Sequence, residues 1–348
     1  MNEWVFKSVK KITADFKRSA DTHMIKLSIP YFNGVDIYLK DESTHPTGSL
    51  KHRLARSLFM YALCNGKIDA QTTIIESSSG STAVSEAYFA QLIGVPFIAV
   101  MPSSTAKSKI QQIELYGGQC HFVEHATQMN SEAQKLAKSL NGYFMDQFTY
   151  AERATDWRGN NNIADSIFKQ LAYEEHAIPH TIVMSAGTGG TSATIGRYIN
   201  YQGYNTRLLV VDPENSVFYD SYIKQDRSLS IQTSSHIEGI GRPQVEPSFQ
   251  PDVIDSMMQV PDAASVATIH WLEKIIGRKA GASTGTNLWG VLQVAQQLMQ
   301  QNQQASLVTL LCDSGERYLD TYYNSAWVNE HIGDLEPYTK QLRLFCPE

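Results

Sequence analysis

The sequence predicts an α/β protein built from two open, twisted, mainly parallel sheets flanked by helices. Three observations support this prediction. Apolar strand-like runs alternate with helix-like stretches for most of the 348 residues, glycines end several of these helices, and small polar residues follow several strands. A chain of this length exceeds one ordinary hydrophobic core, so we expect two domains.

The predicted strands are short apolar runs rich in Ile, Val and Leu. They are residues 72–80, 96–102, 119–124, 180–186, 206–213 and 305–312. The predicted helices have apolar residues at helical spacing, and several end at a glycine. They are residues 52–63, 81–94, 104–117, 131–142, 163–174, 191–202, 261–277 and 283–301. This alternation predicts βαβ units.

The alternation pauses at residues 146–162, where the sequence DQFTYAERATDWRGNNN is polar and irregular. We interpret this stretch as a domain junction. The expected domains are therefore residues 1–155, the smaller, and residues 156–348, the larger. Residues 1–35 are assigned to the first domain, with the alternative that they pack on the second.

Composition limits the partners and the compartment. The formal net charge is −6 and charged residues make up 18% of the chain, which argues against nucleic acid or an anionic membrane as the main partner. No stretch approaches the roughly 20 apolar residues of a membrane span, and the N-terminus does not resemble a signal peptide. The four cysteines form no CxxC pair, so we expect no disulfide framework and no metal site. Cys64 and Cys312 are expected to be buried thiols, and the expected location is cytoplasmic.

One lysine stands at the junction of a turn and a helix in THPTGSLKHRLARSL, residues 44–58. Pro46 and Gly48 mark the turn, and a helix follows from residue 52. A helix N-terminus carries partial positive charge, so a protonated Lys51 gains nothing there. Lys51 is either an ordinary solvated lysine or a neutral amine that acts as a nucleophile or forms a Schiff base.

A glycine-rich turn joins a strand to a helix in MSAGTGGTSATIGRYI, residues 184–199. Its glycines let backbone N–H groups converge, and its threonines add hydroxyls. The turn consists of Gly187, Thr188, Gly189, Gly190 and Thr191. It lacks the third glycine of GxGxxG and the GK[ST] of a P-loop, so a single phosphate fits better than a pyrophosphate. The alternative is a tight structural turn.

Two further loops are rich in hydroxyls at predicted helix starts. ESSSGST, residues 76–82, suits a carboxylate, although any one of its serines could be an ordinary helix cap. KAGASTGTNLWG, residues 279–290, has the same alternative. An activated lysine, a phosphate site and a carboxylate site together indicate pyridoxal 5′-phosphate (PLP) and an amino-acid substrate.

These stretches, in this order, resemble the cysteine synthase and cystathionine β-synthase family of PLP enzymes, which have fold type II and are tryptophan synthase β-like. The resemblance runs from about Ile37 to Leu319. YLKDESTHPTGSLKHR resembles the lysine segment, which implies that Lys51 carries the cofactor. ESSSGSTA and DQFTYAERA resemble the segments that bind the substrate carboxylate, which implies this role for Ser78, Ser79, Thr82 and Gln147.

The second half of the chain continues the resemblance. GTGGT is similar to the phosphate loop, and IEGIGRP resembles the loop that faces the substrate amine, which implies that Gly239 contacts the substrate. GASTG corresponds to the segment whose hydroxyl meets the pyridine nitrogen, with Ser283 the first choice and Thr284 the next. The family resemblance also implies a homodimer.

Two departures from the family pattern narrow the expected activity. Ser81 stands where the family usually has asparagine against the cofactor, and His52 stands where it usually has aspartate. The chain looks most like the bacterial L-cysteine desulfhydrases of this fold, because it combines these two residues with the segments GSLKHRLARSL, SSGSTAVSEAYFA, GRPQVEPSF and STGTNLWG. The resemblance implies a PLP-dependent carbon–sulfur lyase that converts L-cysteine into hydrogen sulfide, pyruvate and ammonia through an aminoacrylate.

Three alternatives stay open at this point. The chain could be a cysteine synthase or a cystathionine β-synthase-like enzyme, which replaces the β-substituent of an activated serine. It could be a nicotinamide-dependent oxidoreductase, although GxGxxG is missing. It could also be a binding module without activity, against which the intact Lys51 argues.

Overall fold

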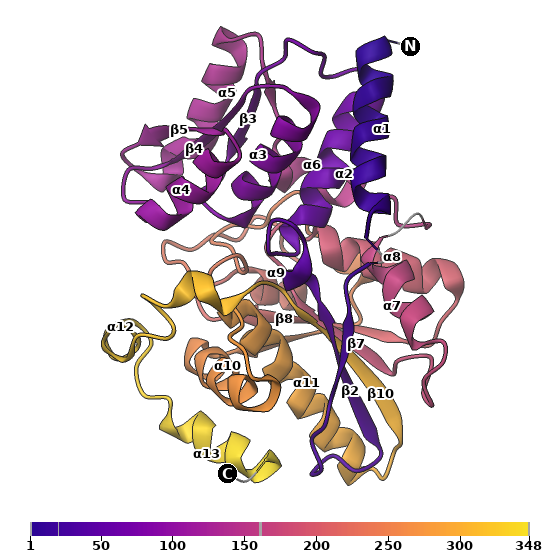
Figure 1. The fold of residues 1–348 in the computed structure, drawn as a ribbon. Helices are drawn as coiled ribbons and strands as arrows, with labels where there is room; N and C mark the ends of the chain where they lie inside the picture. The colour runs from indigo at the N-terminus through magenta and orange to yellow at the C-terminus, as the bar shows by residue number, and fades with distance from the viewer. Residues whose placement is uncertain (1, 20, 160–161, 347–348) are drawn as a thin grey trace. The chain divides into compact units, whose positions relative to one another are not determined.

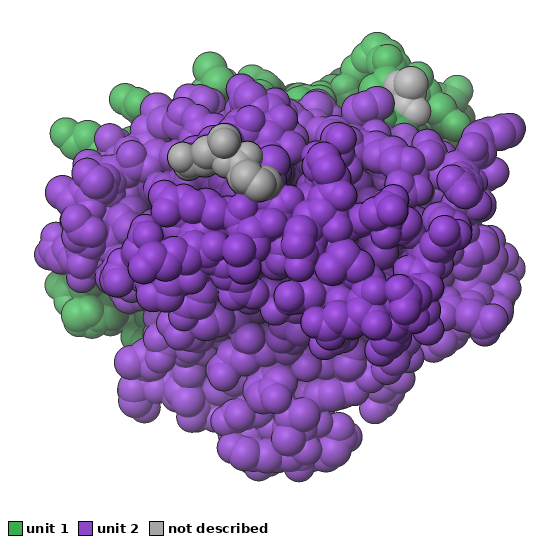
Figure 2. Space-filling model, turned by 90° about the horizontal axis from the view of Figure 1, so that it is seen from below, with its two compact units in different colours: residues 1–21, 45–155 green, residues 22–44, 156–348 purple. Residues whose placement is uncertain are grey.

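The computed structural model describes residues 2–19, 21–159 and 162–346 (Figure 1). The chain divides into two compact units, shown in two colours in Figure 2. Unit 1 comprises residues 1–21 and 45–155, and unit 2 comprises residues 22–44 and 156–348. The units differ from the expected domains in segment 22–44, which belongs to unit 2 while residues 1–21 belong to unit 1. In the described part of the chain, no helix has the length and apolarity needed to cross a membrane.

Unit 1 contains a four-stranded sheet in the order β5-β4-β3-β6, in which all neighbouring strands are parallel. The strands are β3 (Ile74–Ser77), β4 (Phe97–Pro102), β5 (Gln119–Val123) and β6 (Tyr143–Phe144). Because side chains alternate along a strand, Ile74 and Ile75 enter different apolar clusters, and both are fully buried.

Helices cover the sheet of unit 1. They are α1 (Glu3–Lys17), α2 (Lys51–Cys64), α3 (Ser81–Ile93), α4 (Lys107–Leu115), α5 (Met129–Ser139) and α6 (Gln147–Ala154), with the short 3₁₀ helix η2 at Ala126–Gln128. Helix α5 packs on β3, β4 and β6, whereas α3 packs on β3 and β4 and is itself covered by α1 and α2. The larger apolar cluster of the unit joins residues of α2, α3 and the sheet.

Unit 2 contains a six-stranded sheet in the order β1-β2-β10-β7-β8-β9. The strands are β1 (Met24–Leu27), β2 (Val35–Asp41), β7 (Thr181–Ser185), β8 (Arg207–Pro213), β9 (Ser256–Val260) and β10 (Ala305–Leu311). Only the edge pair β1 and β2 is antiparallel among these strands, and the other neighbours are parallel. Strands β7 and β10 are buried along their whole length, as expected for the centre of a parallel sheet covered on both faces.

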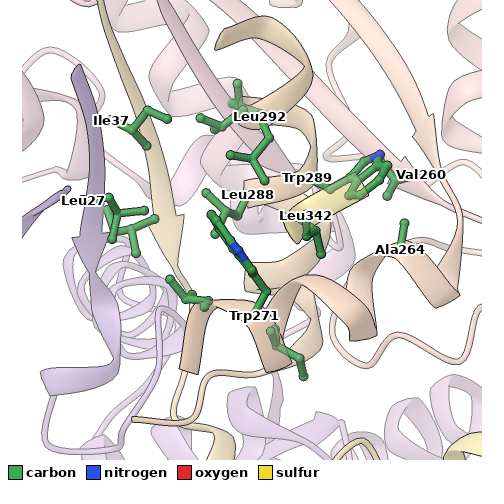
Figure 3. Close-up of a cluster of buried hydrophobic side chains, with 14 of the residues drawn as sticks. Leu27, Ile37, Val260, Ala264, Trp271, Leu288, Trp289, Leu292 and Leu342 are labelled. Carbon is green, nitrogen blue, oxygen red and sulfur yellow. The ribbon is translucent and has the colours of Figure 1, made fainter. Parts of the chain in front are cut away.

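The helices of unit 2 are α7 (Ile163–Leu171), α8 (Gly190–Gln202), α9 (Phe218–Lys224), α10 (Asp262–Ile276), α11 (Ala282–Gln300), α12 (Ser325–His331) and α13 (Glu336–Phe345). Short 3₁₀ helices lie at Glu42–Thr44 (η1), Pro251–Val253 (η3) and Gly315–Tyr318 (η4). Helix α11 contacts every parallel strand of the sheet, and α10 packs on α11 and α13. Figure 3 shows the resulting core, in which Trp271, Leu288 and Leu292 lie among side chains of the sheet and of α13.

The predicted fold class is confirmed, because both sheets are mainly parallel and flanked by helices. Two smaller expectations are wrong. Residues 147–154 form helix α6 within the stretch expected to be irregular. Cys64 is exposed and Cys312 is half-buried, whereas buried thiols were expected at both positions.

Candidate active site

Lys51 is the first residue of α2 and is half-buried. The turn before it is tight, because the Gly48 N–H donates to the carbonyl of His45 at 2.7 Å and Gly48 has a φ of +69°. That left-handed conformation favours glycine. Ser49 is 2% exposed, and its hydroxyl has no hydrogen-bond partner among the described residues. A polar group from outside the chain could therefore be held beside this turn.

His52 anchors the first turn of α2. Its Nδ1 lies 3.1 Å from the Thr47 hydroxyl, which in turn lies 2.8 Å from the hydroxyl of Ser85 in α3. The imidazole also stacks on His45, with 5.0 Å between the ring centroids, and packs on Phe89 at 4.8 Å. The residue that departs from the family pattern thus ties the lysine turn to α3.

The hydroxyl-rich loop lies between β3 and α3. Ser78 is buried and its hydroxyl accepts the Gly80 N–H at 3.3 Å, while Ser79 and Ser81 are half-buried. In the described residues, the N–H groups of Ser79 and Thr82 have no hydrogen-bond partner. Open N–H groups at a helix N-terminus suit an anion such as a carboxylate.

Gln147 meets this loop from the start of α6. The Thr82 hydroxyl donates to Gln147 Oε1 at 2.8 Å, and both side chains are buried. This arrangement leaves the amide nitrogen of Gln147 as a donor for a second acceptor. The structure therefore brings together two residues that lie far apart in the sequence and that were both expected to bind the substrate carboxylate.

Beneath the loop lies a residue that sequence reasoning missed. Glu76, in β3, is fully buried, and its carboxyl group accepts the N–H of Ser77 at 2.7 Å and the N–H of Gln147 at 3.1 Å. Burial raises the pKa of Glu76 above its ordinary range, whereas the two backbone N–H groups oppose this by stabilising the charged form. The available signal was a glutamate inside an apolar strand, because glutamate is almost never fully buried without a partner.

The glycine-rich turn of unit 2 joins β7 to α8. Gly189 has a φ of +86°, and the Gly190 N–H is held by the Thr188 hydroxyl at 3.3 Å. Among the described residues, the N–H groups of Gly187, Gly189 and Thr191 have no partner. Converging open N–H groups at a helix N-terminus are typical of a phosphate site.

Close packing explains the glycines of this turn. A Cβ at Gly189 would lie 2.6 Å from the Cα of Phe249, and a Cβ at Gly187 would overlap the carbonyl oxygen of Gly239. The Gly241 N–H also donates to the Ala186 carbonyl at 2.8 Å. Gly239, expected to contact the substrate, therefore lies directly beside the predicted phosphate loop within the same unit.

Tyr322 holds the segment that leads into Gly239. Its hydroxyl donates to the carbonyl of His236 and accepts the N–H of Glu238, both at 2.8 Å. Burial raises the pKa of Tyr322 well above its ordinary range, so the phenol keeps the proton that it donates. The Asp262 carboxylate also accepts the His236 N–H at 3.0 Å.

The two hydroxyls at the start of α11 differ in their partners. The Thr284 hydroxyl accepts the N–H of Cys312 at 3.0 Å. Ser283 is 7% exposed, and its hydroxyl makes no hydrogen bond within the described ranges. This difference favours Ser283 as the residue that could reach a pyridine nitrogen.

Features expected of a PLP-binding protein occur in both units. The lysine turn and the carboxylate loop belong to unit 1, and the glycine-rich turn and Ser283 belong to unit 2. A phosphate needs open N–H groups with no Cβ in the way, and the turn at 187–191 supplies them. Within the parts of the chain that the structure describes, no group of three or more His, Cys, Asp or Glu side chains is arranged to hold a metal ion.

A comparison with known families identifies the class. The family described as pyridoxal-phosphate dependent enzyme matches residues 19–313, so this chain belongs to that family and uses PLP. The family and the cofactor predicted from the motifs are therefore confirmed. The chain is 57% identical over 330 residues to the L-cysteine desulfhydrase Cds1 of Mycobacterium tuberculosis, which covers 94% of this chain and 90% of that protein.

Solved structures agree on the fold. The O-acetylserine dependent cystathionine beta-synthase from Helicobacter pylori has a TM-score of 0.75 and 26% identity, over 86% of this chain and 94% of that chain. O-ureido-L-serine synthase has a TM-score of 0.77 and 24% identity, over 86% of this chain and 91% of that chain. The similarity to O-ureido-L-serine synthase shows that the two chains share a fold.

Proposed function

We propose that this chain is a PLP-dependent L-cysteine desulfhydrase. The reaction consumes L-cysteine and one water, and it releases hydrogen sulfide, pyruvate and ammonia, so atoms balance without an oxidant or a second substrate. The observation that carries the proposal is the 57% identity to a protein named for this activity, over 94% of the present chain.

PLP, when bound, supplies an electron sink that stabilises negative charge at the substrate Cα. Lys51 Nζ would hold the cofactor covalently and, as a free amine, would accept the Cα proton of the substrate. The half-buried position of Lys51 at a helix N-terminus supports this role, because partial positive charge there disfavours a protonated amine. The phosphate group is bound by the glycine-rich turn, which consists of Gly187, Thr188, Gly189, Gly190 and Thr191.

The substrate is oriented by its carboxylate. Ser78, Ser79, Thr82 and Gln147 bind it through hydroxyls, open N–H groups and the Gln147 amide, and Gly239 lies near the substrate amine. Ser283 would meet the pyridine nitrogen with a neutral hydroxyl, which stabilises positive charge less than a carboxylate does. This weaker support would favour loss of the thiol group from Cβ of the substrate.

Ser81 bears on the balance between elimination and replacement. A serine in place of asparagine leaves room beside the cofactor, which we expect to admit water and to favour release of pyruvate. The second candidate is β-replacement of an activated serine. The observation that supports this candidate is the similarity to the Helicobacter pylori protein, which is named as an O-acetylserine dependent cystathionine beta-synthase.

We also infer a homodimer in the cytoplasm. The dimer rests on the resemblance to the fold type II family. The cytoplasmic location rests on widely spaced free thiols, of which Cys64 is exposed, as is usual in a reducing compartment. Light scattering on the purified holoprotein tests the dimer, and a monomer mass would contradict it.

The activity is tested by product analysis. Purified holoprotein is incubated with L-cysteine alone, and sulfide and pyruvate are followed over time. We expect both to appear in equal amounts. Absence of pyruvate, together with rapid formation of cysteine from O-acetylserine and sulfide in a parallel reaction, would instead establish the replacement enzyme.

A further inference from the structure

Glu86 is an unexpected residue for the position it occupies. It lies in α3, one turn after the carboxylate loop, and it is fully buried. The helix around it buries Ala83, Ala87 and Ala90, so its surroundings are largely apolar. A charged carboxylate in such a place needs hydrogen-bond donors or a cation to be stable.

No donor serves it. Neither carboxyl oxygen of Glu86 has a hydrogen-bond partner in the described residues, and the ionisable side chain that interacts with it is the carboxyl of Glu76. Two ionised carboxylates would both be acceptors and would repel each other. A hydrogen bond between them therefore requires a proton on one of the two.

The proton belongs on Glu86. Glu76 already accepts two backbone N–H groups, at 2.7 Å and 3.1 Å, which stabilise a negative charge there, whereas Glu86 accepts none. Asp146, at the N-terminus of α6, is a further acidic neighbour of Glu76 and favours keeping a proton in the pair. Burial and the neighbouring Glu76 raise the pKa of Glu86 well above its ordinary range.

The pair connects to the substrate-binding loop through Glu76. One Glu76 oxygen holds the backbone of Ser77, where the loop begins, and the other holds the backbone of Gln147, whose side chain meets Thr82 at 2.8 Å. A shift of the Glu76 carboxyl would therefore move both the loop and Gln147.

We propose that Glu86 is a positioning residue that, as a neutral carboxylic acid, donates a hydrogen bond to Glu76 and so fixes Ser77 and Gln147 for binding the substrate carboxylate. The proposal deepens the proposed function and rests on it for the identity of the substrate. It assigns to Glu86 an effect on substrate affinity, with little effect on the chemical step or on PLP binding.

The test compares three variants of the holoenzyme. Glu86→Gln keeps a donor in the same place, since its amide N–H replaces the acid O–H. Glu86→Leu removes the donor. Tyr88→Phe is the matched control, because it lies in the same helix and loses a hydrogen bond to Asp15 of α1, at 2.7 Å, which is not part of the loop network.

We expect Glu86→Leu to raise KM for L-cysteine by about tenfold with a nearly unchanged kcat, because a buried hydrogen-bond partner is lost. Glu86→Gln should restore a nearly normal KM, and Tyr88→Phe should leave KM unchanged. Infrared spectra should show the carbonyl stretch of a protonated carboxylic acid in the wild type, weakened in Glu86→Gln.

Two results would overturn the proposal: a KM in Glu86→Gln as high as in Glu86→Leu, or an acid band of equal strength in Glu86→Gln and wild type. If Glu86→Leu does not fold, Glu86→Gln and the infrared band still decide. Failure of the proposed function is distinguishable, because wild-type protein would then release no sulfide from L-cysteine, whereas the infrared result does not depend on the substrate.

Discussion

Lys51 is the single residue with the largest expected effect on activity. It stands at the start of α2 behind a turn that requires the left-handed conformation of Gly48. Replacing it by alanine removes the amine that holds the cofactor and moves the Cα proton. We expect Lys51→Ala to lose the covalent link to PLP and nearly all turnover while the protein stays folded.

Borohydride reduction of the holoprotein followed by peptide mapping measures the link directly. Exposed Lys107 of α4 offers a matched control, and Lys107→Ala should behave as the wild type. Labelling of any lysine other than Lys51 would show that the assignment is wrong.

Ser81 gives a second residue-scale prediction. Ser81→Asn restores the amide usual in the family and fills the space expected beside the cofactor. We expect the ratio of pyruvate formation to thiol exchange to fall, because less water reaches the site. Ser81→Ala, which removes the hydroxyl without filling the space, should keep the wild-type ratio. An equal ratio of pyruvate formation to thiol exchange in the wild type, Ser81→Asn and Ser81→Ala would show that Ser81 does not influence the balance between elimination and replacement.

The sequence predicted the role of single residues where the chemistry of a site requires a particular type of residue. The glycines at 187–190 and the hydroxyls at 77–82 were visible as motifs, because phosphate and carboxylate sites need open N–H groups and small side chains. The packing of His52 and the buried pair of Glu76 and Glu86 were not visible, since both depend on contacts between elements distant in sequence.

At the scale of elements, alternation of apolar runs and helical spacing predicted strands β3, β4, β5, β7, β8 and β10 and most of the long helices, but not the parallel strands β2, β6 and β9. Helix α6 was missed because two of its three buried residues, Gln147 and Glu152, are polar, so no apolar stripe marks it. The placement of β1 and β2 was missed for another reason. Strand β2 pairs with β10, which lies more than 260 positions away in the sequence, and β1 joins the sheet only through β2. No local pattern encodes such a pairing.

The turn between β7 and α8 supports an element-scale prediction. Gly189→Ala places a Cβ 2.6 Å from Phe249 Cα on a backbone with a φ of +86°. We expect PLP affinity to fall by at least about tenfold, since strain of roughly 1–3 kcal/mol displaces the converging N–H groups. Absorbance titration of the apoprotein with PLP measures this.

Gly203→Ala is the matched control for that prediction. Gly203 ends the same helix with a φ of +68°, but a Cβ there meets nothing within 4 Å. It therefore carries a similar backbone strain without the clash. Equal PLP affinities in the two variants would contradict a role of the turn in binding the phosphate.

For the whole molecule, the cofactor should stabilise the folded state. PLP that binds only the folded protein adds about 4 kcal/mol at a thousandfold excess over its Kd, by mass action. We expect removal of PLP to lower the midpoint of thermal unfolding by several degrees, and added PLP to restore it in a concentration-dependent way. An identical midpoint for apoprotein and holoprotein at every PLP concentration would contradict specific binding to the folded chain.

The whole-molecule prediction that succeeded was the class: an α/β protein in the family of pyridoxal-phosphate dependent enzymes. It succeeded because the lysine segment, the carboxylate loop and the phosphate loop each have their own chemical requirement and occur along the chain in the order that is typical of the family. The assignment of segments to compact units was less accessible, because residues 22–44 precede the lysine turn in sequence yet join the sheet of unit 2.

The central claim is that L-cysteine is the only amino-acid substrate required and that water completes the reaction. Its most direct test is the ratio of pyruvate to sulfide released from L-cysteine by the purified holoenzyme, measured with and without an excess of mercaptoethanol. The account predicts close to one pyruvate per sulfide without the added thiol, and pyruvate as the main product with it. Sulfide release only when the thiol is present, with a thioether amino acid in place of pyruvate, would contradict the account and identify a β-replacement enzyme.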